Sequence, residues 1–96
     1  MASYKLTDAA KQDIADIREC SLNQWGTDQT SLYLKQIRER MRWLAQSPKL
    51  GELREDIKPG YYSFLEGRHC IYYRIKKKNI EVLAVLHQSM DTKRLL

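Results

Sequence analysis

The chain is poor in the residues that build disulfide frameworks, metal centres and flexible loops. Its 96 residues include only two cysteines, two prolines and four glycines. Cys20 and Cys70 have no partners at zinc-ligand spacing, so we expect two reduced and partly buried thiols. The four glycines do not form a phosphate-cradling loop. The sequence therefore predicts neither a bound metal nor a cofactor.

Long apolar runs are also absent. No stretch approaches the roughly 20 apolar residues that a membrane helix needs, and residues 1–8 lack the apolar core of a signal peptide. We therefore expect a cytoplasmic protein without a membrane segment. Hydrophobic residues make up 43% and charged residues 30% of the chain, as in ordinary folded domains. The length supports one domain, residues 1–96, with one modest core.

Acidic residues are outnumbered by basic ones. Seventeen lysines and arginines against twelve aspartates and glutamates give a net charge of +5. Residues 68–78 contain no acid, and their cations are Arg68, Arg74, Lys76, Lys77 and Lys78. Such a field raises the encounter rate with an anionic partner, either an acidic protein or a nucleic acid. The alternative is that lysines in a turn keep a sheet edge soluble. The sequence leaves both interpretations open.

The first half of the chain predicts a short strand followed by two helices. Tyr4 and Leu6 alternate with Lys5, which favours a strand, and Thr7 fits a helix N-cap. The buried face of the first helix is formed by Ala10, Ile14, Ile17 and Ser21, and Trp25 lies at the edge of this face. Gly26 is typical of a helix end, so we expect the two helices to fold back as a hairpin.

The second helix has the clearest periodicity in the sequence. Its apolar stripe is formed by Tyr33, Leu34, Ile37, Met41 and Leu44. Leu32 and Trp43 are eleven residues apart and therefore share the opposite face. The tryptophan either lies over arginine and lysine stems or belongs, with Leu32, to a second contact surface.

The second half predicts a connection from about residue 47 to 60 and then three strands. In the strand at residues 68–75, one face presents Ile71, Tyr73 and Ile75 and the other presents Tyr72 and Arg74. In the last strand, one face presents Ile80, Val82, Ala84 and Leu86 and the other presents Leu83 and Val85. A strand that is apolar on both faces is typical of a central position. The predicted fold is α+β: a small antiparallel sheet in the order β-α-α-β-β-β, with the helical hairpin on one face.

Several short motifs occur in a fixed order along almost the whole chain. They are Leu6-Thr7-x-x-Ala10, Trp25-Gly26, Leu44-Ala45-x-x-Pro48-x-x-Gly51, Tyr72-Tyr73-Arg74-Ile75 and Leu86-His87-x-x-Met90-Asp91. In order and spacing the chain resembles ParE-type toxins of the ParE/RelE superfamily. The resemblance implies the toxin of a type II toxin–antitoxin system, which inhibits DNA gyrase by binding and is not an enzyme. It also implies neutralisation by a small acidic antitoxin, ParD-like or related, and contact with nucleic acid only through the gyrase–DNA complex.

Two sets of residues are candidates for these contacts. For the target and toxicity they are Arg74, His87, Met90, Asp91, Lys93, Arg94, Leu95 and Leu96. For the antitoxin they are Leu32, Trp43, Arg68 and Lys76.

The main alternative is a RelE-like endoribonuclease that cleaves messenger RNA on the ribosome. The parts available for such a site are Arg54, Tyr72, Arg74, Glu81 and His87. His87 could serve as a general acid and Arg74 could hold a phosphate. However, His87 is not followed by the late tyrosine typical of the ribosome-dependent enzymes, and we predict no catalytic residues. A third possibility is a binding module of the same fold that is no longer toxic.

Overall fold

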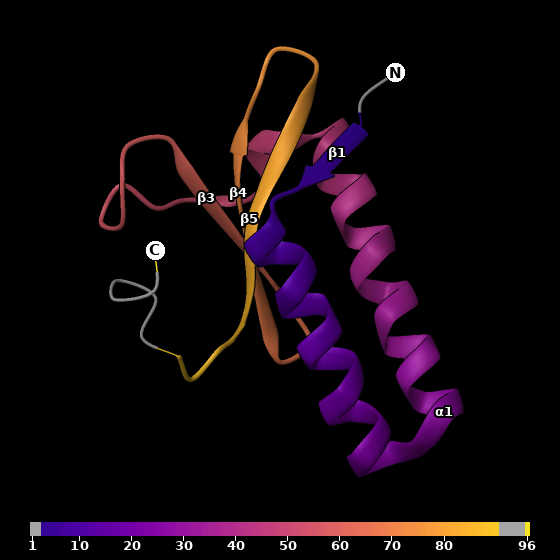
Figure 1. The fold of residues 1–96 in the computed structure, drawn as a ribbon. Helices are drawn as coiled ribbons and strands as arrows, with labels where there is room; N and C mark the ends of the chain where they lie inside the picture. Colours follow the sequence, from indigo (N-terminus) through magenta and orange to yellow (C-terminus); the bar gives the residue numbers. More distant parts are fainter. Residues whose placement is uncertain (1–2, 91–95) are drawn as a thin grey trace.

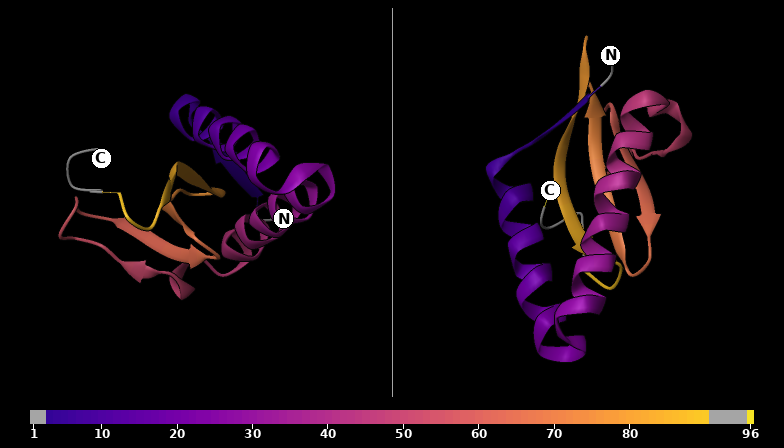
Figure 2. Two further views of the ribbon diagram at one scale, coloured as in Figure 1. Left: turned by 90° about the horizontal axis from the view of Figure 1, so that it is seen from below. Right: turned by 90° about the vertical axis from the view of Figure 1, so that its right-hand side faces the viewer.

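The computed structural model describes residues 3–90 and residue 96, and it has two layers. The elements in chain order are β1 (Ser3–Leu6), α1 (Asp8–Gln46), the 3-10 turn η1 (Pro48–Leu50), β2 (Glu52–Leu53), β3 (Tyr61–Glu66), β4 (His69–Ile75) and β5 (Asn79–His87). The helical segment α1 covers one face of the sheet (Figures 1 and 2). The predicted α+β class is confirmed.

The sheet has five strands in the order β1-β5-β4-β3-β2. β5 lies between β1 and β4, which confirms its predicted central position. The prediction of a purely antiparallel sheet was wrong, because β1 pairs in parallel with β5. It also missed β2, which forms inside the connection and pairs antiparallel with β3. Local patterns fix the direction of a strand joined by a tight turn, whereas the direction of β1 depends on which distant strand it joins.

The helical segment α1 begins at a capped end. The Thr7 side chain accepts a hydrogen bond from the Ala10 N–H at 3.1 Å, which confirms the predicted N-cap. Gly26 is the one non-helical residue inside the segment, with φ 82° and ψ −176°. This left-handed φ costs glycine little because it has no Cβ. The ribbon reverses there, and its two arms lie side by side over the sheet (Figures 1 and 2).

The main core lies between α1 and the sheet. Its buried residues are Ala10, Ile17, Leu34, Ile37, Met41, Leu44, Ala45, Ile71, Tyr73, Ile80, Val82 and Val85. A smaller cluster on the outer face of the sheet is formed by Tyr72, Ala84 and Leu86, with Ile57, Cys70 and Leu96 packed against it. We call this group the outer cluster. The helical stripes predicted from the sequence therefore supply the helical half of the main core.

A β-bulge interrupts the pairing of β4 with β5. Tyr73 pairs with Val82 but Tyr72 pairs with Ala84, so Leu83 is an extra residue in β5. Beyond Leu83 the side chains of β5 change faces, and Ala84 joins the outer cluster instead of the main core. The predicted alternation, with Val82, Ala84 and Leu86 on one face, was therefore wrong after Val82.

Side chains at the start of α1 complete the pairing of β5 beside this bulge. The β1 pairing ends at Val82. Beyond it, the Thr7 hydroxyl donates to the Leu83 carbonyl at 3.1 Å, and the Val85 N–H donates to a carboxylate oxygen of Asp13 at 3.0 Å. These bonds satisfy backbone groups that a neighbouring strand would otherwise pair.

Candidate partner-binding surfaces

The bulge places two histidines opposite each other at one end of the sheet. His69 of β4 pairs with His87 of β5, and their rings meet edge to face with centroids 5.4 Å apart. The Tyr33 hydroxyl lies 2.6 Å from His69 Nδ1, and the Arg68 N–H donates to the same hydroxyl at 3.2 Å. We call His69 and His87 with Tyr33 the histidine end. It joins the second arm of α1 to the sheet.

Electrostatics set the protonation states of Tyr33 and His69. Burial, and secondly the charge of His87, lowers the pKa of His69. Burial also raises the pKa of Tyr33, with a smaller contribution in the same direction from Glu66. At neutral pH the tyrosine is therefore protonated and the imidazole is neutral. The hydroxyl has one proton, which it donates either to His69 Nδ1 or to the Glu66 carbonyl at 3.3 Å, and the tautomer of His69 selects between the two.

The histidine end makes the stability of the protein dependent on pH. Folding lowers the pKa of His69, so the unfolded chain binds more protons than the folded chain once the pH is below the ordinary pKa of histidine. The contribution of His69 to the free energy of unfolding therefore falls as the pH falls from about 7 to about 5. His69→Gln removes this contribution, so the difference in stability between wild type and variant should shrink as the pH falls. Urea unfolding at several pH values measures it.

A comparison between variants is needed because another group changes the stability with pH in the opposite direction. Burial raises the pKa of Asp13, so its protonation at low pH stabilises the folded state. His87→Gln is the matched control, because it retains the burial of His69 and most of the pH dependence. A wild-type to His69→Gln difference that stays constant with pH would contradict the prediction.

The candidate target residues at this end of the molecule lie on two faces. His87 is half-buried, its Nδ1 lies 2.8 Å from the Ser89 hydroxyl, and Met90 is 49% exposed. Both line a hollow of about 260 Å³ against the first arm of α1, with Asp13, Asp16 and Cys20 on the opposite wall. Leu96 packs on the outer cluster. Asp91, Lys93, Arg94 and Leu95 lie outside the described residues.

Arg74 lies near the other end of the sheet. It pairs across strands with Glu81, and the Arg74 Nε lies 2.7 Å from the Glu81 Oε1. Glu81 alternates with the core residues Ile80 and Val82, so this ion pair is on the outer face of the sheet. Lys76 follows at the tip of the β4–β5 ribbon and is exposed.

The residues proposed for an RNA-cleaving site are only partly brought together, because Arg74 pairs with Glu81 on the outer face of the sheet and His87 lies apart from this pair. Glu81 and His87 are six positions apart in β5, which is about 20 Å along a strand, and the two side chains lie on opposite faces. Tyr72 is 3% exposed within the outer cluster. Arg54 donates two hydrogen bonds of 3.0 Å to Asp56, which raises the pKa of the guanidinium. No phosphodiester could contact His87 and the Arg74–Glu81 pair simultaneously in this geometry.

The two apolar antitoxin candidates lie on the outside of α1. Leu32 is 50% exposed and Trp43 is 38% exposed. The Arg40 guanidinium lies 4.5 Å from the centre of the Trp43 ring, and Phe64 meets the same ring edge to face at 5.4 Å. This supports the interpretation of Trp43 as a ring that packs against an arginine. Eleven residues of helix place Leu32 about 16 Å away, so the two side chains are separate contact points on one face.

Arg68 and Lys76 do not join this surface. Arg68 lies in the turn between β3 and β4, and its guanidinium lies 5.7 Å from the centre of the Trp25 ring. These two residues line a hollow of about 300 Å³ together with Tyr33 and His69. The sequence offered little to find this corner, because His69 would oppose Leu86 without the bulge. Lys76 lies at the opposite end of the sheet.

Three further expectations concern cysteine, metal and membrane chemistry. Cys70 is half-buried but Cys20 is exposed, so partial burial was wrong for Cys20, which lies on α1 beside the buried stripe and not within it. Within residues 3–90 and 96, no three histidine, cysteine or acidic side chains gather in a way that could hold a metal ion. Over the same residues, no helix combines the length and apolarity required to cross a membrane.

The arrangement of elements is similar to that of solved toxin structures. The chain described as "Chromosomal ParDE TA system from P. aeruginosa" superposes with a TM-score of 0.76 at 24% identity, covering 91% of this chain and 96% of that one. A chain from the toxin–antitoxin complex RelBE2 of Mycobacterium tuberculosis gives a TM-score of 0.64 at 18% identity, covering 91% and 98%. At these low sequence identities, the similarity shows that the chains share a fold and shows nothing further.

Sequence comparison identifies the family to which the chain belongs. The proteins named Toxin ParE1 are 35% identical over 92 residues in Mycobacterium tuberculosis, covering 95% of this chain and 94% of the relative, and 32% identical over 93 residues in Caulobacter vibrioides, covering 97% and 96%. The family model described as "ParE toxin of type II toxin-antitoxin system, parDE" matches residues 4–92. The chain therefore belongs to the ParE toxin family of type II toxin–antitoxin systems.

Proposed function

We propose that this ParE-family toxin inhibits DNA gyrase by binding and has no catalytic chemistry of its own. The observation that carries the proposal is the separation of Glu81 and Arg74 from His87 by about 20 Å and by the thickness of the sheet. General acid catalysis and phosphate stabilisation require their groups around one scissile bond. Binding does not, and exposed groups at both ends of the sheet suit it. Arg74, His87, Met90 and Leu96, with the tail before Leu96, stay our candidates for the target contact.

We also propose a small acidic antitoxin, ParD-like or related, as the neutralising partner in the bacterial cytoplasm. The net charge of +5 would steer an acidic chain toward this protein. Leu32 and Trp43 are exposed on one face of α1 and offer apolar contact points for a segment that folds on binding. The proposal is supported by the two structural relatives, which are both described as parts of toxin–antitoxin systems.

A gyrase assay tests the proposed activity. Purified protein added to gyrase and relaxed plasmid should inhibit supercoiling and increase the amount of linear DNA. Growth of bacteria that express the toxin alone should stop. Adding the antitoxin encoded beside the toxin should restore supercoiling, which separates specific inhibition from non-specific effects of a basic protein.

Translating ribosomes with labelled messenger RNA supply the opposing measurement. We expect no cleavage by the wild type, and the double variant Arg74→Ala/His87→Ala should behave identically. Intact gyrase activity, combined with RNA cleavage that this folded double variant loses, would overturn the proposal in favour of a RelE-like ribonuclease. Harmless expression without any antitoxin would instead indicate a binding module that is not toxic.

A further inference from the structure

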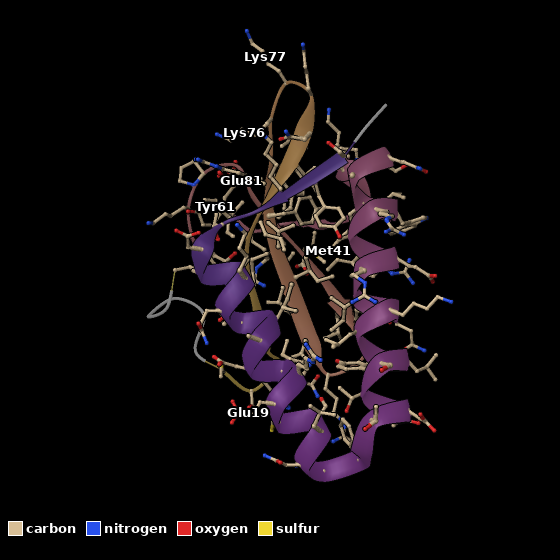
Figure 3. All side chains as sticks on the ribbon, turned by 45° about the vertical axis from the view of Figure 1, so that its right-hand side comes forward. Glu19, Met41, Tyr61, Lys76, Lys77 and Glu81 are labelled. Atoms are coloured by element: carbon tan, nitrogen blue, oxygen red, sulfur yellow. The ribbon has the colours of Figure 1, made fainter. Side chains whose placement is uncertain are left out.

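Four lysines gather at the tip of the β4–β5 ribbon. Lys76, Lys77 and Lys78 form the turn between the two strands, and Lys5 lies on the adjoining strand β1 opposite Glu81. All four are exposed. Figure 3 shows Lys76 and Lys77 at this end, directed away from the body of the protein. We call these four residues the basic tip.

Among the described residues, the lysines of the basic tip are not neutralised by an ion pair of their own. Glu81 is the acidic residue that borders it, and Arg74 already occupies this carboxylate at 2.7 Å. Over the described part of the chain, no ion pair involves any of the four lysines. Three consecutive ammonium groups repel one another, so they lower the stability of the turn. The charge is therefore better explained by a partner than by the fold.

The shape of this end also differs from that of a protected sheet edge. β3 pairs with β4 only as far as Arg74, so the ribbon continues beyond its neighbour on that side. Figure 1 shows the β4–β5 hairpin extending past β3 and past the helical layer. The strands of the hairpin are interior strands of the sheet, and lysine protection of an edge strand does not account for charges in their turn.

We propose that the basic tip binds the phosphate backbone of duplex DNA directly. A projecting two-stranded ribbon has the dimensions that a DNA groove admits, and lysines are point charges suited to phosphates. Residues 75–80 contain no aromatic side chain, so the tip offers no stacking platform for unpaired bases. The hollow at the tip is lined by four lysines, Asn79 and Glu81, without an apolar anchor for a folding acidic peptide. This contact is independent of the identity of the toxin's protein target.

The test is a titration of a short fluorescent DNA duplex of mixed sequence, followed by anisotropy at several potassium chloride concentrations. Each phosphate contact contributes about 0.9 to the slope of log affinity against log salt. The variant Lys76→Gln/Lys77→Gln/Lys78→Gln should reduce this slope by about 2 to 3 and weaken binding to any sequence to the same extent. Adding Lys5→Gln should reduce it by about one more.

A charge-matched variant controls for the net charge of the protein. Lys35→Gln/Arg38→Gln/Arg42→Gln removes the same number of positive charges from exposed positions on α1. It should leave most of the salt slope unchanged. Equal losses in the two triple variants, or no measurable duplex binding by the wild type, would overturn the proposal.

Two competitors define the class of partner. Unlabelled duplex DNA should displace the probe, whereas polyglutamate of equal charge should compete weakly. If polyglutamate binds the wild type more tightly than duplex DNA, and the tip variant loses that binding, the tip serves an acidic polypeptide and the DNA proposal is wrong. Because no gyrase is present, failure here leaves the proposed gyrase inhibition standing, and failure of the gyrase assay leaves this result standing.

Discussion

Gly51→Ala should destabilise the folded state by about 2–4 kcal/mol, because it overfills a packed site and breaks a buried hydrogen bond. A Cβ at this position would overlap the hydroxyl oxygen of Tyr73 and lie 2.9 Å from its Cζ. Tyr73 is 0% exposed, and its hydroxyl donates to the Pro48 carbonyl at 2.6 Å. Burial raises the pKa of Tyr73 to about 12, so the hydroxyl stays protonated as a donor.

The cost of Gly51→Ala comes from packing and not from the backbone. Gly51 has φ −73° and ψ 169°, which alanine adopts freely. Tyr73→Phe removes the hydroxyl that the new methyl group would overlap, although it leaves the Pro48 carbonyl without this donor. The double variant should therefore be more stable than the sum of the two single changes implies, by about 1 kcal/mol or more. Urea unfolding of all four proteins measures this coupling, and strict additivity would rule out the steric explanation.

Met41→Ala should cost about 2–5 kcal/mol, because it removes buried atoms and leaves a cavity. Met41 is 0% exposed in the main core, within the apolar stripe that the second arm of α1 presents to the sheet. Figure 3 labels this side chain between the helical layer and the sheet. Thermal and urea unfolding should both show the loss, with the urea dependence of stability little changed.

Leu32→Ala is the matched control for Met41→Ala. Leu32 lies on the same arm of α1 but is 50% exposed, so its truncation should change stability by less than about 0.5 kcal/mol. If Leu32 belongs to the antitoxin contact, the same variant should bind the antitoxin more weakly while remaining as stable as the wild type. Comparable destabilisation by both variants would mean that the helical face is packed differently from the structure described here.

Local patterns predicted the elements well where the signal lies within a few residues. The N-cap at Thr7 follows from a hydroxyl that can reach the Ala10 N–H, and the buried stripe around Met41 follows from helical periodicity. Both signals are complete within one helix. The prediction missed β2, whose two residues, Glu52 and Leu53, are exposed and lack an alternating pattern.

The candidate site could be predicted only residue by residue. Arg74 and His87 were recognised as chemically capable groups, but the pairing of β4 with β5, which places them at opposite ends of the sheet, was invisible in the sequence. His69 was not selected at all, because its contacts with Tyr33 and His87 arise from the packing of α1 and from the bulge. Proximity between groups on different elements is a property of the folded state.

The sequence by itself determined the periodic faces of the helices, the capped start of α1, the reversal at a glycine and the basic character of the ribbon tip, since each depends on neighbouring residues. Only the tertiary structure decided that β1 runs parallel to β5, that Leu83 is an extra residue, and that charged and titratable groups lie at opposite ends of the sheet. The physical reason is that strand partners and bulges are selected by the packing of the whole core. One inserted residue is then enough to move every later side chain of β5 to the other face.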